Sequence, residues 1–188
     1  MKVKLNWSNN CANIEQPPVC IQSWLMEPYI LSQELKKRCG SLNISLLGQV
    51  KTIAPVDEYS LLCAFAKKTN KFDCSKNDAK NIWLREVVLN KVVYARISVL
   101  YNHFSENKSW FLSVGNKSFG ESLLYNNSNI ARSNFEYSCV KPYSYLHNAV
   151  VDVYGYILEQ FWARRSVFTF DNCAILVTEC FLPGIENY

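Results

Sequence analysis

The segment WARRSVFTFDNCAILVTECFLP, residues 162–183, decides the fold class of this chain. Two runs rich in β-branched and aromatic residues, 167–170 and 174–178, flank an Asp-Asn dipeptide at 171–172 that is typical of a turn. The segment therefore predicts a β-hairpin. Glu179 continues the second apolar run, where a carboxylate is costly to bury unless it has a partner. We interpret Glu179 either as half of a structural ion pair or as a ligand-binding group.

A second segment, IWLREVVLNKVVYARISVL at residues 82–100, also carries charges within apolar runs, and its Asn-Lys dipeptide at 90–91 predicts another hairpin. Arg85 and Glu86 must point to opposite faces, because side chains alternate along a strand. One of them is then buried, and a buried charge requires a partner. Arginine suits bidentate capture of a carboxylate. The residues alone leave two hypotheses open: a closed anion-binding pocket, or a structural Arg–Glu pair inside the sheet.

The composition predicts one folded domain that spans residues 1–188. Hydrophobic residues make up 49% of the chain and charged residues 19%, as in an ordinary globular protein. Residues 1–16 are polar and rich in asparagine, so we expect a loose N-terminal arm. No apolar run approaches the ~20 residues of a membrane span, and the N-terminus lacks the apolar core of a secretory signal. We expect a cytoplasmic protein without a membrane span.

The charge and cysteine patterns favour a small anionic ligand over a nucleic acid or a metal. The formal net charge of +4 is mild and diffuse. The densest basic run, 36–38, falls at the end of a predicted helix, where cations interact favourably with the helix dipole. The eight cysteines are scattered singly, and neither of the two histidines has a cysteine or carboxylate at ligand spacing. We expect no metal and no nucleic-acid partner.

Helix signals early in the chain and hairpin signals later predict an α+β fold, a single antiparallel sheet of about six strands with helices on one side. Ser32 is predicted to cap a helix that ends at Gly40, and Ser105 is predicted to cap a short helix. The segment 141–160 fits either a strand extension or an inserted helix. The other expected elements are a helix over 17–25, strands over 42–50 and 131–140, a polar loop over 67–80, and short helices over 106–113 and 119–125. The segment 56–67 is mixed, and its residues 59–66 fit either a strand or a helix.

Several motifs resemble the bacterial chorismate pyruvate-lyase family, in the same order along the chain. The segment 162–183 is similar to the C-terminal hairpin of that family, and WLRE at 83–86 matches its Trp-Leu-Arg-Glu strand. The segment NKSFGESLL at 116–124 is similar to its Lys-x-x-Leu-Gly flap, and residues 24–40 resemble its first helical pair. The resemblance covers most of residues 20–183, and the two strand motifs are specific only when taken together.

This resemblance implies a ligand site that helical flaps close off from solvent, with no metal and no organic cofactor. It implies that Arg85 and Glu179 are the catalytic residues. Arg85 would bind the ring carboxylate of the substrate, and Glu179 would contact its 4-hydroxyl group. Backbone groups at Leu31 and Phe119, one in each flap, would complete the substrate-binding site.

Arg96 matches an arginine of the same family on the strand after Trp-Leu-Arg-Glu, which implies that it binds the enolpyruvyl carboxylate. A structural bridge between Glu86 and Arg96 is an equal alternative, because the predicted hairpin places them near each other. The sequence also departs from the family: the turn at 90–91 is short, the segment 141–160 looks like an insertion, and the flap positions 31 and 119 are apolar without being identical.

The activity that the resemblance implies is conversion of chorismate to 4-hydroxybenzoate and pyruvate, the first committed step of ubiquinone biosynthesis. We expect a monomer whose partners are the substrate chorismate and the product. The alternative from another class is a non-catalytic effector-sensing domain, as in GntR-type transcription regulators, which share the expected fold. Such domains normally follow a DNA-binding winged helix, and residues 1–20 are too short and polar to form one.

Overall fold

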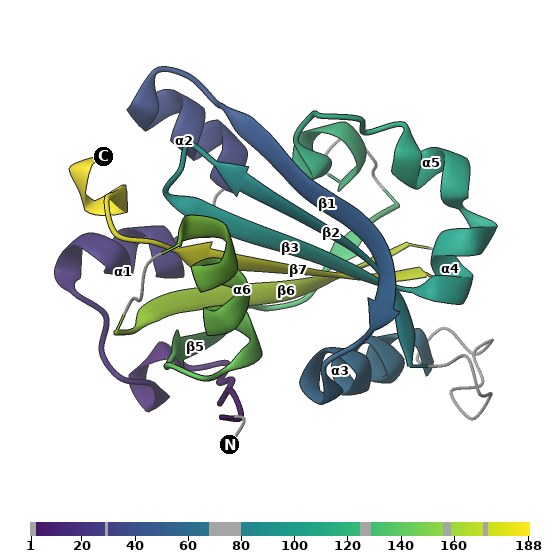
Figure 1. Cartoon of the computed structure of the whole chain (residues 1–188), viewed down its shortest axis with the longest axis horizontal. Coiled ribbons are helices and arrows are strands. Elements are labelled where there is room, and N and C mark those ends of the chain that lie inside the picture. Colours follow the sequence, from purple (N-terminus) through teal and green to yellow (C-terminus); the bar gives the residue numbers. More distant parts are fainter. Residues whose placement is uncertain (1–2, 29, 68–79, 125–128, 156–158, 171–172) are drawn as a thin grey trace.

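The computed structural model describes residues 3–28, 30–67, 80–124, 129–155, 159–170 and 173–188. Across these ranges, seven strands form one antiparallel sheet in the order β1-β2-β3-β7-β6-β4, and β5 also pairs with β6 (Figure 1). The strands are β1 (Ile44–Ile53), β2 (Asn81–Leu89), β3 (Val93–Leu100), β4 (Ala131–Arg132), β5 (Glu136–Val140), β6 (Phe161–Phe170) and β7 (Cys173–Phe181). The predicted class is confirmed, with seven strands in the described part of the chain where about six were expected.

The two predicted hairpins form the centre of the sheet. In the β6–β7 hairpin, Phe170 pairs with Cys173, and the predicted turn residues 171–172 lie outside the described residues. In the β2–β3 hairpin, Asn90 and Lys91 both take left-handed backbone conformations (φ 47° and 61°), as a tight hairpin turn requires. The Asn90 side chain also accepts a hydrogen bond from the Asn43 backbone N–H (2.6 Å), which ties β1 to this turn.

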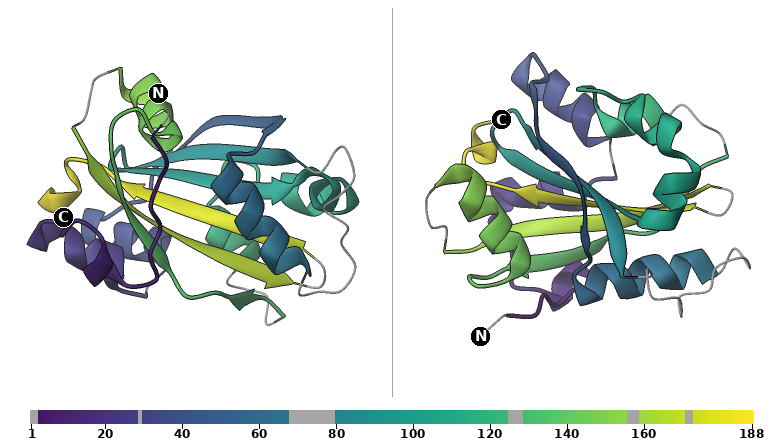
Figure 2. Two further views of the ribbon diagram at one scale, coloured as in Figure 1. Left: turned by 90° about the horizontal axis from the view of Figure 1, so that it is seen from below. Right: turned by 45° about the vertical axis from the view of Figure 1, so that its right-hand side comes forward.

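Helices cover both faces of the sheet (Figure 2). The helices are α1 (Val19–Met26), α2 (Leu31–Cys39), α3 (Val56–Lys67), α4 (Tyr101–Glu106), α5 (Lys108–Leu112), α6 (Tyr145–Tyr154), the π-helical turn η2 (Gly120–Leu124), and the 3-10 turns η1 (Cys11–Asn13) and η3 (Ile185–Asn187). The central strands are apolar on both faces, so both must be covered. On β2, Val87 and Leu89 pack with α1 and α2, whereas Leu84 packs with α3 and Val88 with α6.

The structure decides the secondary structure of the segments that the sequence left open. The ambiguous segments 56–67 and 141–160 contain the helices α3 and α6, and the predicted strand over 131–140 divides into β4 and β5. Ser144 accepts a hydrogen bond from the His147 backbone N–H and caps α6. Within the described ranges, no helix combines the length and the apolar character needed to cross a bilayer.

The two predicted serine caps are wrong. The helix α2 begins at Leu31 with Ile30 at its N-cap position, so Ser32 lies inside the first turn and its hydroxyl is used elsewhere. The prediction that Gly40 ends this helix is confirmed, and its φ of 74° is one that glycine adopts without strain. Ser105 lies within α4, where its hydroxyl donates to the Tyr101 carbonyl (2.8 Å).

Candidate active site

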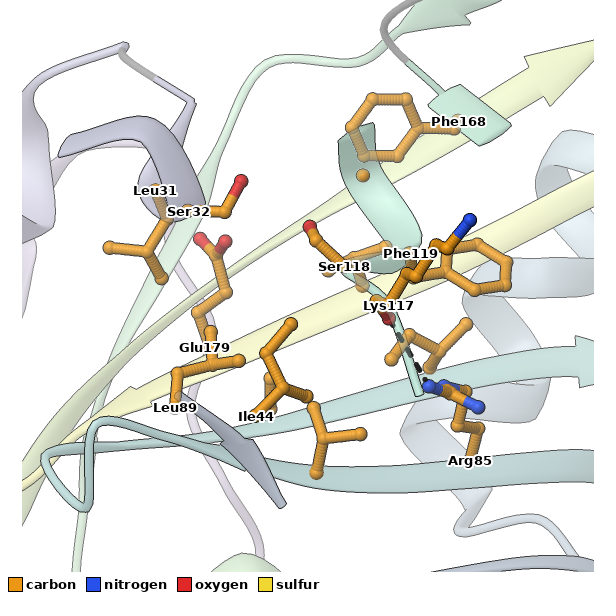
Figure 3. Close-up of a pocket in the computed structure, with 15 residues that line it drawn as sticks. Leu31, Ser32, Ile44, Arg85, Leu89, Lys117, Ser118, Phe119, Phe168 and Glu179 are labelled. Atoms are coloured by element: carbon orange, nitrogen blue, oxygen red, sulfur yellow. Dashed lines mark hydrogen bonds between the residues drawn. The ribbon is translucent and has the colours of Figure 1, made fainter. Parts of the chain in front are cut away.

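A pocket lies between the sheet and two covering segments (Figure 3). We call these segments the α2 flap (residues 30–39) and the 114–124 flap. The strands β2, β3 and β7 supply most of the floor, and the walls are largely apolar. The lining residues are Leu31, Ser32, Ile44, Arg85, Val87, Leu89, Ala95, Ile97, Lys117, Ser118, Phe119, Gly120, Phe168, Val177 and Glu179. The pocket therefore brings together four of the five predicted site residues, all except Arg96.

Arg85 is a fully buried cation with spare donors. Its side chain lies on β2 with no exposed surface, and its Nη2 donates to the carbonyls of Gly115 (2.8 Å) and Lys117 (3.4 Å) in the 114–124 flap. Its Nε and Nη1 have no hydrogen-bond partner among the described residues. Burial lowers the pKa of the Arg85 guanidinium from its ordinary value, because the charged form loses its hydration. A buried guanidinium that lacks a counter-charge among the described residues has the chemistry to bind an anionic group.

Glu179 lies on β7 and is 8% exposed, but it does not pair with Arg85. Its Oε2 accepts a hydrogen bond of 2.6 Å from Nε of Arg164, which lies directly opposite it on β6. Figure 3 shows the Glu179 carboxylate directed toward Ser32, with Arg85 at the other end of the pocket beneath Lys117. The site is therefore an apolar slot with a guanidinium at one end and a carboxylate at the other, and each charge is held by its own partners.

The two flaps meet above this slot. Leu31 and Phe119 each present a buried side chain to it, 3% and 6% exposed. The Ser32 hydroxyl donates to Oε1 of Glu121 (3.1 Å), a contact that joins the α2 flap to the 114–124 flap. These contacts cover part of the pocket on the side away from the sheet.

Sequence reasoning missed Arg164 and the pocket residues Ser32, Ser118 and Phe168 as parts of the site. Arg164 could have been found, because the predicted turn at 171–172 sets a register that places residue 164 directly opposite residue 179. Ser32 carries no comparable signal, since its contact with Glu121 joins segments that lie far apart in the chain. Within the described ranges, no group of three or more His, Cys, Asp or Glu side chains is arranged to hold a metal ion.

The structure does not bring Arg96 to the pocket. Arg96 lies on the opposite face of β3, where its Nε donates to Glu58 Oε1 (2.7 Å) and its Nη1 to Glu86 Oε1 (3.0 Å). Glu86 and Arg96 are direct neighbours in the hairpin register, which matches the structural alternative. Glu58 is fully buried and also accepts a hydrogen bond from the Ser98 hydroxyl (2.8 Å). Arg96 thus fastens α3 to the sheet.

Replacement of Arg96 by methionine should lower the free energy of unfolding by about 3–5 kcal/mol, because it leaves Glu58 buried without a counter-charge. Chemical denaturation measures this loss. At a temperature where the variant remains folded, its turnover and its affinity for a pocket ligand should match the wild type. A variant with normal stability and impaired turnover would contradict this structural assignment and support a role of Arg96 in substrate binding.

The fold and the pocket together define an α+β protein with a largely apolar pocket that holds a buried arginine and a carboxylate. The chain belongs to the chorismate lyase family, whose sequence model matches residues 1–187. A protein of Pseudoalteromonas atlantica named "Probable chorismate pyruvate-lyase" is 30% identical over 98% of this chain and 90% of its own length. A protein of Shewanella sp. (strain W3-18-1) with the same name is 26% identical over 91% of this chain and 84% of its own length.

Among solved structures, the chain is similar to the ligand-binding domain of a GntR-family transcriptional regulator from Bordetella bronchiseptica. The TM-score is 0.48 and the identity 12%, over 77% of this chain and 86% of that one. A GntR-family regulator from Enterococcus faecalis gives the same TM-score and identity, over 75% of this chain and 94% of its own.

Proposed function

We propose that this protein is a chorismate pyruvate-lyase, which converts chorismate to 4-hydroxybenzoate and pyruvate. One observation carries the proposal: Arg85 is buried at one end of an apolar slot with two donor atoms that have no hydrogen-bond partner in the described part of the chain, and Glu179 lies at the other end. The ring of chorismate carries a carboxylate at carbon 1 and a hydroxyl at carbon 4, at its two ends. The slot matches this para arrangement, because a guanidinium fork binds a carboxylate and a carboxylate accepts a bond from a hydroxyl.

The reaction breaks the bond from carbon 3 to the enolpyruvyl oxygen and the C–H bond at carbon 4. A double bond forms between carbons 3 and 4 and makes the ring aromatic, and the hydrogen lost from the ring is balanced by the one gained when enolpyruvate becomes pyruvate. Since aromatisation supplies the driving force, the protein needs mainly to hold one conformer, exclude water and stabilise developing charge. In this proposal, Arg85 fixes the ring carboxylate, Glu179 fixes the 4-hydroxyl, and the flaps exclude water.

Incubation of the purified protein with chorismate tests the proposal. We expect equal amounts of 4-hydroxybenzoate, measured by chromatography, and pyruvate, measured by coupled reduction to lactate. The Arg85→Met variant, purified in the same way, controls for contaminating activity. Tight binding of 4-hydroxybenzoate without any product from chorismate would show a non-catalytic binding domain instead.

We further propose that the protein acts as a monomer in the cytoplasm and supplies the first committed step of ubiquinone biosynthesis. The family membership of the chain supports this assignment. Expression of the gene in a bacterial strain that lacks its own chorismate lyase should restore ubiquinone to the membrane lipid extract. If that strain produces 4-hydroxybenzoate but does not recover ubiquinone, the proposed role in ubiquinone biosynthesis is contradicted, whereas the proposed reaction is not.

Product release should be slow, because 4-hydroxybenzoate keeps both groups that the slot binds and the joined flaps must open before it leaves. We expect a burst of one product per site, then a slower steady rate, with competitive inhibition by 4-hydroxybenzoate. The Ser32→Ala variant removes the contact with Glu121 and should raise the steady rate about two- to tenfold, which corresponds to the net free energy of one such hydrogen bond.

Rapid-quench measurement of the first turnover checks this prediction. Ser113→Ala is a matched control, because the Ser113 hydroxyl bonds within its own segment, to the Trp110 carbonyl (2.6 Å). A linear time course from the first turnover, without inhibition by added product, would show that release is not limiting.

A further inference from the structure

Two consecutive arginines on β6 have opposite surroundings. The side chain of Arg164 has no exposed surface and lies on the pocket side of the sheet, where its Nε donates to Glu179 Oε2 (2.6 Å). Its Nη1 donates to the Glu27 carbonyl (2.7 Å), at the C-terminal end of α1. Arg165 is 5% exposed and lies on the other side, where it donates to Glu136 and Asp57. The two arginines are therefore similar in burial and in the number of these hydrogen bonds, and they differ in the face of the sheet on which their side chains lie.

Aromatic rings and a main-chain carbonyl hold the Arg164 guanidinium in place, so it can fix the orientation of the Glu179 carboxylate. Rings of Phe135 and Phe181 lie 4.4 and 5.4 Å from its central carbon, and a guanidinium over an aromatic face is attracted to it. Its bond to the Glu27 carbonyl ties it to the main chain just before the α2 flap. Because its planar group is rigid and can only donate, it fixes the orientation of the Glu179 carboxylate by binding one of its two oxygens.

We propose that Arg164 is a positioning residue for ligand recognition. It holds Oε2 of Glu179 and thereby leaves Oε1 to accept a bond from the 4-hydroxyl of the ligand. Arg164 also binds the Glu27 carbonyl, which precedes the α2 flap in the chain, so that one side chain holds both the Glu179 carboxylate and the main chain next to the flap. This inference rests on the proposed function, since it concerns how the same pocket distinguishes a ring that carries a 4-hydroxyl from one that does not.

The test compares binding of 4-hydroxybenzoate with binding of benzoate, which lacks the hydroxyl. Isothermal titration should show that the wild type prefers 4-hydroxybenzoate, and that Arg164→Gln reduces this preference about tenfold while benzoate affinity changes little. Loss of fold alone would not move this ratio. In Glu179→Ala, where the acceptor is absent, adding Arg164→Gln should not reduce the ratio further, because the two residues act as a unit.

Arg165→Gln is the matched control. It should lower the melting temperature, because it leaves Asp57 and Glu136 without their counter-charge, yet keep the wild-type ratio. If Arg164→Gln does not fold, Arg164→Lys provides the test. A lysine keeps the charge but cannot hold Glu179 and the Glu27 carbonyl with one rigid fork, so the ratio should fall about threefold.

An Arg164→Gln protein, or an Arg164→Lys protein in its place, that keeps the full wild-type preference would overturn this inference while the proposed function stands. A wild-type protein that neither binds 4-hydroxybenzoate nor turns over chorismate would overturn both. The assignment is supported if the wild type binds 4-hydroxybenzoate and turns over chorismate, Arg164→Gln loses the preference for 4-hydroxybenzoate over benzoate, and Arg165→Gln keeps it.

Discussion

Replacement of Arg85 by methionine should reduce kcat/KM for chorismate by roughly 30- to 1000-fold, which corresponds to about 2–4 kcal/mol of transition-state stabilisation. Methionine keeps most of the length of the side chain and removes the charge and the fork. If Arg85 is the seat of the ring carboxylate, the variant should also lose measurable affinity for 4-hydroxybenzoate. Steady-state kinetics measures kcat/KM for chorismate, and isothermal titration measures the affinity for 4-hydroxybenzoate.

The stability of the same variant separates a binding role from a structural role. Arg85 is buried with Nε and Nη1 unpartnered among the described residues, so its charge costs free energy in the ligand-free protein. The melting temperature of ligand-free Arg85→Met should therefore equal or exceed that of the wild type, whereas the increase that 4-hydroxybenzoate produces in the wild type should vanish.

Arg85→Lys completes this series, because it keeps a positive charge at nearly the same place. A lysine cannot form two parallel hydrogen bonds with a carboxylate, so this variant should also be poor, with activity above that of Arg85→Met. An Arg85→Met protein with activity within about threefold of the wild type would rule out the assignment of Arg85 to the carboxylate.

The sequence was sufficient to predict the parts of this fold that depend on neighbours along the chain. The two hairpins follow from apolar runs on either side of a turn, and the adjacent charges Arg85 and Glu86 within such a run already indicated that one of the two is buried. Such signals are local, because the hydrophobic pattern and the turn together set the register.

The parts that escaped prediction depend on contacts between distant segments or on the choice of face. Since β2 and β3 are apolar on both faces, alternation could not show which face each helix covers. The flap contact joins Ser32 to Glu121, 89 residues apart, and no local pattern indicates such a pair. What appeared to be a helix cap at Ser32 is instead part of the pocket cover.

Glu179→Gln should reduce kcat/KM for chorismate by about 30- to 1000-fold as well, for a reason that the structure makes specific. Arg164 can only donate, so the introduced glutamine must turn its carbonyl oxygen toward Nε of Arg164. Its NH2 group then faces the pocket, where the 4-hydroxyl of the substrate needs an acceptor. The substitution thus replaces an acceptor by a donor at nearly constant volume. Kinetics with chorismate and titration with 4-hydroxybenzoate measure the loss.

The melting temperature of this variant should also fall, because the fully buried Arg164 loses its counter-charge and keeps only a neutral hydrogen bond. Glu136→Gln is the matched control, since Glu136 accepts a bond of the same kind from Arg165 (2.7 Å) on the opposite face of the sheet. That variant should lose some stability and keep full activity. If Glu179→Gln behaves in the same way, destabilised but fully active, then the Arg164–Glu179 pair is purely structural. If it loses activity and Glu136→Gln does not, the carboxylate of Glu179 acts on the substrate.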